Sequence, residues 1–241
     1  MTHTGDNWRD HAYSFTPRNF IERPRHIRLA IDYLPTAWSG HDHVAAPRIG
    51  AFGHSAGGFT VLVAIGGKPG ASLLDSLCFE HPDEWGRQRR QQRVVALGPS
   101  SDPPATVWLH DERTKAAIAA APAAGYAFTA GGLAGVKTPV RLWEAEDDRR
   151  APNRWNGDVV KANLPSPPEA HPVQTADHFA FLAPCGEALA ARVPEICREP
   201  PGFDRTAFHH DLNEAVVAFF RKQLGPLAAI GGRRPLLYDR R

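Results

Sequence analysis

A serine between two glycines, in residues 53–57, has the spacing of a catalytic nucleophile. These residues follow the pattern G-x-S-x-G. Residues 48–52 before them are typical of a short buried strand, and apolar side chains recur at helical spacing after them. A strand, a sharp turn and a helix would hold the Ser55 hydroxyl outward, and the glycines would remove side chains that collide with backbone. A structural turn serine is the alternative, because the pattern alone is weak.

The helix expected after Ser55 also offers a place for negative charge. Backbone amides at a helix start are free to bind anions. We therefore expect the N–H of Ala56 to bind the oxyanion of a tetrahedral intermediate.

A candidate acid follows the next predicted strand. Residues 138–145 predict a strand entered through a proline, and residues 146–152 form an acidic turn directly behind it. An α/β sheet displays its catalytic groups just past such strand ends. Asp148 is the candidate acid and Asp147 is the reserve. The turn would also suit a solvated acidic segment that pairs with the arginines beside it.

A candidate base follows the acid, as the order serine, acid, histidine requires. The chain has 12 histidines, and His178 differs from the others by its position. It comes directly behind a short predicted strand, residues 172–175, and ahead of an apolar run. We expect His178 to act as general base toward Ser55, with Asp148 fixing its tautomer. A buried structural histidine is the alternative.

With these residues, the chain resembles the predicted dienelactone hydrolase family, α/β-hydrolases related to the platelet-activating-factor acetylhydrolases. The matching stretches are residues 53–58, 142–152, 178–185 and 193–204. The resemblance implies an α/β-hydrolase fold, with a mostly parallel sheet flanked by helices. It also implies a serine ester hydrolase, and we expect a small-molecule ester as its substrate. Peptidase and lactonase activities share this triad and are alternatives. The expected mechanism needs no metal or organic cofactor. Family members that open dienelactone use a cysteine where this chain has Ser55, so that substrate is not expected.

The chain departs from the family at its start. Residues 1–7 resemble the end of the family's fourth strand, so the first three strands, with the loop that carries a second oxyanion donor, would be missing. The strand at 48–52 would then have an unpaired edge, which is costly within a sheet. A misplaced start codon, an inactive natural truncation, or a second chain covering the edge, as in a homodimer, would each account for this. The alternative function is therefore a hydrolase-like protein that acts through binding or assembly.

The resemblance also concerns the cysteines, of which the chain has three. It implies that Cys185 and Cys197 pair, which would tie the histidine loop to the segment after it. Cys78 matches a family position whose usual partner has no counterpart here, so we expect a free thiol.

Length and composition predict one domain over residues 1–241, since 42% of the chain is hydrophobic. Within it, we expect residues 66–114 to be an insertion or cap-like segment and residues 225–241 to be a mobile tail. The net charge of +2 gives no electrostatic case for nucleic-acid binding, and no run approaches the ~20 apolar residues of a membrane span. Residues 1–10 lack the apolar core of a secretory signal. We expect a cytoplasmic protein, or a periplasmic or secreted one if a signal segment precedes this sequence.

Two polar clusters are less specific. The basic residues in 87–93 fit the wet face of a helix better than an anion-binding patch. Residues 41–43, His-Asp-His, fit an exposed loop better than a metal site, because no third ligand stands at a suitable spacing.

Three further elements must support the candidate site. Residues 27–34 predict an amphipathic helix that ends at Pro35, and residues 116–122 predict a buried strand, with an alanine-rich helix as the alternative. Asp211 and Glu214 resemble a capping box at the start of a last helix. That helix should pack behind the sheet and support the His178 loop.

Overall fold

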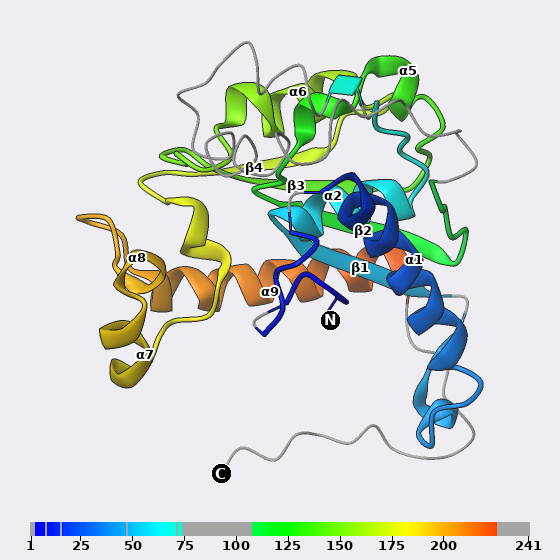
Figure 1. The fold of residues 1–241 in the computed structure, drawn as a ribbon, viewed down its shortest axis with the longest axis horizontal. Coiled ribbons are helices and arrows are strands. Elements are labelled where there is room, and N and C mark those ends of the chain that lie inside the picture. The colour runs from blue at the N-terminus through cyan, green and yellow to red at the C-terminus, as the bar shows by residue number, and fades with distance from the viewer. Residues whose placement is uncertain are drawn as a thin grey trace.

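The structure is a computed structural model, and it describes residues 3–7, 9–14, 16–46, 48–70, 72–73 and 108–225. Within these residues, four strands form one parallel sheet in chain order, as Figure 1 shows. The strands are β1 (Ile49–His54), β2 (Thr114–Ala120), β3 (Val140–Ala145) and β4 (Glu169–Val173). The molecule is therefore an α/β protein, and the carboxyl ends of its four strands lie along one edge of the sheet.

Two hydrophobic layers cover the two faces of this sheet. On one face, α2 (Ala56–Ala64) packs with α1 (Pro17–Tyr33), α5 (Ala130–Leu133) and α6 (Gly157–Asn163). On the other face lies α9 (Arg205–Leu224) (Figure 1). β2 shows the alternation of a strand buried on both sides: Ala117 and Ala119 belong to the first layer, while Ile118 belongs to the second.

β2 settles one alternative of the sequence, because residues 114–120 form a strand and not an alanine-rich helix. Its side chains from Ala116 to Ala120 are fully buried. The small side chains let helices pack closely against both faces of the sheet. An alanine run on a central strand therefore reflects close packing on both sides and not helix propensity.

β1 lies at the edge of the sheet. Within the described residues it pairs with β2 alone, and Phe52 on it is 43% exposed. This agrees with the unpaired edge expected for this strand. That a second chain covers it stays a prediction.

Three boundaries differ from those expected. α1 begins ten residues earlier than the predicted helix 27–34, because Thr16 caps it and Pro17 occupies its first position. It ends at Tyr33, ahead of Pro35 as expected. β4 runs from Glu169 to Val173 and not over 172–175, because an edge strand tolerates Pro172 and Thr175 adopts a left-handed conformation with φ 57°.

The predicted capping box of the last helix is wrong. Asp204 caps α9 by accepting a hydrogen bond from the Ala207 amide at 2.9 Å. Asp211 and Glu214 lie inside the helix and are exposed. The helix does pack behind the sheet. Its His209 Nε2 lies 2.9 Å from the carbonyl oxygen of Ala180, next to the His178 loop.

Near the N-terminus, residues 3–6 form a turn closed by a bridge between His3 and Asp6, and not the strand end that the family pattern suggested. Cys78, the basic residues 87–93, most of the segment 66–114 and residues 226–241 lie outside the described residues. Among the helices that are described, none combines the length and the apolar character of a membrane span.

Beyond β4 the chain forms three short helical segments, and the predicted disulfide joins the loop before the second to the end of the third. They are η5 (His178–Phe181), α7 (Glu187–Arg192) and α8 (Pro194–Cys197). Cys185 and Cys197 are bonded, and their Cα atoms lie 5.7 Å apart. The pairing that the resemblance implied is thus confirmed.

Removing this disulfide is expected to destabilise the fold. The bridge closes a loop with a sequence separation of 12 residues, and by loop-closure entropy this contributes about 3 kcal/mol. The double variant Cys185→Ser/Cys197→Ser should lose about that much free energy of unfolding in urea titrations. Cys78→Ser, which leaves the bridge intact, is the control. Alkylation of all three cysteines in denatured, unreduced protein would contradict the bridge.

Candidate active site

Ser55 sits at the apex of a sharp turn between β1 and α2. Its backbone has φ 56° and ψ −119°, in a region that residues with a Cβ rarely adopt. The turn is held on both sides, since the Ser55 amide donates to the Ala120 carbonyl and the Ser55 carbonyl accepts from the Phe59 and Ala123 amides. The Ser55 side chain does not cap α2. Its hydroxyl is thus available for another partner.

The two glycines of the pattern have different roles. A Cβ on Gly53 would lie 2.1 Å from the Gly57 carbonyl oxygen, whereas a Cβ on Gly57 would meet nothing within 4 Å. The expectation that both flanking glycines prevent a collision is therefore wrong for Gly57. The second close approach is made instead by Gly58, whose Cβ would lie 2.9 Å from the Pro122 Cα.

This difference predicts opposite results for two alanine variants. Gly53→Ala should lower the free energy of unfolding by about 2 kcal/mol or more, because backbone must shift to admit the methyl group. Gly57→Ala should leave stability unchanged or raise it slightly, since alanine favours helix over glycine. Urea denaturation of both variants measures this. Equal stability of the two would contradict the close approach at Gly53.

Asp148 follows β3, and its carboxylate is fully buried. One oxygen accepts hydrogen bonds from the amides of Arg150 and Ala151, both at 2.8 Å. Burial acts to raise the pKa of Asp148, but the hydrogen bond from His178, the charge of His178 and the two amides outweigh it, and the pKa is lowered below its ordinary value. Asp148 is therefore an anion at neutral pH.

The reserve acid, Asp147, lies elsewhere. Its side chain is exposed, and its amide donates to the Ala176 carbonyl at 3.0 Å. The turn thus directs Asp148 inward and Asp147 outward. Asp148 is the carboxylate that reaches the candidate base.

His178 joins the other two side chains. Its Nδ1 lies 2.7 Å from the Asp148 carboxylate, and its Nε2 lies 2.8 Å from the Ser55 Oγ. Because a carboxylate only accepts, Nδ1 carries the proton and donates it to Asp148. Nε2 is then free to accept from the Ser55 hydroxyl. Nε2 is thus placed to take the serine proton, and the negative charge of Asp148 lies on the other side of the imidazole.

Ala56 is the first residue of α2. Its amide has no intrahelical acceptor, because the first amides of a helix lie before the first backbone turn is closed. As the residue after Ser55, it lies at the positive end of the helix dipole. A negatively charged oxygen beside the Ser55 Oγ would be stabilised there.

Several contacts that support the site were not evident from sequence. Arg150, which would pair with the acidic turn under the alternative interpretation of that turn, places its guanidinium 4.4 Å from the centre of the Phe179 ring. This contact links the Asp148 loop to the His178 loop. Asn153 donates to the Ala145 carbonyl at 2.8 Å, and the Asn156 side chain accepts from the Gly125 amide at 3.0 Å. Sequence spacing alone does not predict these contacts, because they depend on where the folded backbone places each partner.

The His-Asp-His segment does not form a metal site. Residues 41–43 make one exposed helical turn, in which the His41 Nε2 lies 3.2 Å from the Asp42 carboxylate. In the described part of the chain, no three metal-ligating side chains come together.

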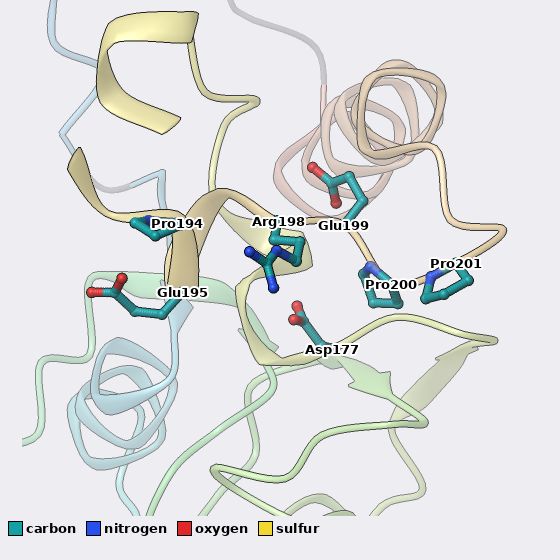
Figure 2. A pocket seen from close by; sticks show the side chains of 7 residues that line it. All are labelled: Asp177, Pro194, Glu195, Arg198, Glu199, Pro200 and Pro201. Atoms are coloured by element: carbon teal, nitrogen blue, oxygen red, sulfur yellow. The ribbon is translucent and has the colours of Figure 1, made fainter. Parts of the chain in front are cut away.

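A pocket of about 440 Å³ lies beside the His178 loop. Asp177 and six residues between 194 and 201 line it, and Figure 2 shows the Arg198 side chain pointing toward the Asp177 carboxylate. Two of its three carboxylates have partners, since Asp177 accepts from the Phe179 amide and Glu199 pairs with Arg205. Neither the Ser55 nor the His178 side chain lines this pocket.

No protein-family model matches this chain, and a search of curated proteins also finds no match. The family resemblance of the sequence therefore stays a prediction.

Proposed function

We propose that the chain is a serine hydrolase that cleaves carboxylic esters, lactones included, through an acyl-enzyme. The observation that carries this proposal is the hydrogen-bonded series Ser55, His178, Asp148, with distances of 2.8 and 2.7 Å. Ser55 also occupies a strained turn between a strand and a helix. The order of the three residues in the chain and the parallel sheet agree with an α/β-hydrolase of the dienelactone hydrolase type.

In the first half of the reaction, the Ser55 Oγ attacks the ester carbonyl carbon while His178 Nε2 takes the hydroxyl proton. The Asp148 carboxylate stabilises the imidazolium that forms. The Ala56 amide donates to the oxyanion of the tetrahedral intermediate. The carbon–oxygen bond to the alcohol then breaks, and His178 returns the proton to the leaving alcohol.

In the second half, water attacks the acyl group on Ser55, and His178 accepts its proton. The bond from the acyl carbon to Oγ breaks, Oγ recovers the proton from His178, and the carboxylic acid leaves. The chemistry requires three side chains and a backbone amide. Water is the only other reactant besides the ester.

A fluorophosphonate probe tests the proposal, because such a probe reacts with an activated serine. Native protein should be labelled at Ser55, as peptide mass mapping would show. Heat-denatured protein and Ser55→Ala should not be labelled. Absence of labelling in the native protein would overturn the proposal.

One observation favours a second candidate function, that of a hydrolase-like protein acting through binding or assembly. Within the described residues we assign a single oxyanion donor, Ala56, and the edge of β1 away from β2 has no strand partner. Loss of one of two donors costs about 10²–10³-fold in turnover. Labelling at Ser55 with negligible ester turnover would support this candidate.

A further inference from the structure

The side chain before the nucleophile, His54, contacts the backbone of the candidate base. Its Nε2 lies 2.8 Å from the His178 carbonyl oxygen. The two imidazole rings lie 4.8 Å apart and are tilted by 46°, and the Phe181 ring is 5.9 Å away. The function proposed above has no step for His54.

The partner of His54 determines its tautomer. A carbonyl oxygen only accepts hydrogen bonds, so His54 Nε2 must carry a proton. Burial, and after it the charge of His178, lower the pKa of His54 to about 4, because the hydrogen bond to the His178 carbonyl and the Asp148 charge only partly oppose them. At neutral pH the ring is therefore neutral, with a proton on Nε2 and no proton on Nδ1.

This contact holds the backbone of His178, which the hydrogen bonds of the triad do not contact. The bonds to Ser55 and Asp148 hold the His178 ring, but both are made by its side chain. The bond from His54 instead holds the His178 backbone, across 124 positions of the chain. Since His54 and Ser55 are neighbours on one turn, it fixes the base directly to the nucleophile's own turn.

The charge of His54 also affects the candidate base. During acyl transfer His178 becomes an imidazolium, whose charge Asp148 balances. A second positive ring 4.8 Å away would disfavour that charge. A neutral donor holds the loop without this repulsion.

We infer that His54 is a positioning residue: its neutral imidazole donates Nε2–H to the His178 carbonyl and holds the base at hydrogen-bond distance from Ser55. This inference rests on the proposed function. Two variants separate the donor from the ring. His54→Phe keeps an aromatic ring and removes the donor, while His54→Gln removes the ring and keeps an N–H at the same number of bonds from the Cα.

The rate of fluorophosphonate labelling at Ser55 and the kcat and KM for a short-chain ester are measured for each variant. His54→Phe should lower the labelling rate and kcat by about 10- to 100-fold, the usual effect of leaving a buried acceptor unpaired. KM should change little, because His54 does not act on the substrate. His54→Gln should recover most of the loss.

The outcomes distinguish the two proposals. No labelling of the wild-type protein overturns the proposed function itself. Normal labelling of wild type together with a wild-type rate for His54→Phe overturns the role of His54. Equal losses in both variants overturn it as well, because the ring and not the donor would then matter.

A measurement on the wild-type protein does not depend on whether the variants fold. Side-chain ¹⁵N NMR of histidine-labelled protein, assigned through His54→Gln or by sequential connectivity, should show His54 protonated at Nε2 and not at Nδ1. It should show no titration between pH 5 and 8, consistent with a pKa of about 4. A proton on Nδ1 alone, or titration within that range, would overturn the inference.

Discussion

Ser55→Ala is expected to lower kcat for a chromogenic short-chain ester by about 10⁶-fold, to the level left by binding and the oxyanion amide alone. The reason is that the Ser55 Oγ, whose proton His178 Nε2 accepts at 2.8 Å, is the atom that attacks the ester. Without that oxygen no acyl-enzyme forms. Release of the chromogenic alcohol under substrate saturation measures the loss.

Ser166→Ala is the matched control, since Ser166 is an exposed serine outside the triad. It should retain the activity of the wild-type protein. Circular dichroism of Ser55→Ala should match wild type, because the strain of the turn is in the backbone and alanine keeps the same Cβ. Undiminished turnover by a folded Ser55→Ala protein would rule out acyl transfer through this serine.

Asp148→Asn is expected to lower kcat by about 10⁴-fold, the usual loss when the carboxylate behind a catalytic histidine becomes an amide. The Asp148 carboxylate accepts from His178 Nδ1 at 2.7 Å and from two backbone amides. An asparagine that keeps its oxygen toward the amides would present an NH₂ group to His178. The imidazole would then hold its proton on Nε2, where it cannot accept from Ser55.

Asp147→Asn is the control for Asp148→Asn, because it makes the same chemical change on the neighbouring, exposed carboxylate. It should leave kcat within about twofold, because its exposed side chain does not contact His178, and exposed substitutions usually have small effects. Ester hydrolysis by both variants, at a pH where wild type is fully active, provides the comparison. A large loss of turnover in Asp147→Asn, together with normal turnover in Asp148→Asn, would show that Asp147 and not Asp148 is the acid.

Much of the candidate site could be predicted because its parts are encoded locally. A strand, a turn with small residues and a helix are each visible as short patterns, and together they place Ser55. Asp148 and His178 each follow a strand, and parallel strands bring their carboxyl ends to one edge of the sheet. Three side chains that are distant in the chain could therefore be expected to meet.

Element boundaries were predicted less well, since neighbours and caps decide them. Asp211 and Glu214 have the spacing of a capping box, yet α9 begins at Arg205. Apolar periodicity continues through a helix and does not mark its start. The residue that caps the helix is Asp204, whose side chain accepts a hydrogen bond from the Ala207 amide.

By itself, the sequence determined which reactive residues are present: a serine at a strained turn, an acidic turn after one strand, and a histidine after the following strand. These follow from residue types and local periodicity, which a single chain displays. The tertiary structure alone decided that Asp148 and not Asp147 faces His178, that Gly53 and not Gly57 avoids a collision, and that His54 donates to the His178 carbonyl. Each of these depends on where distant backbone atoms lie, and sequence spacing carries no such information.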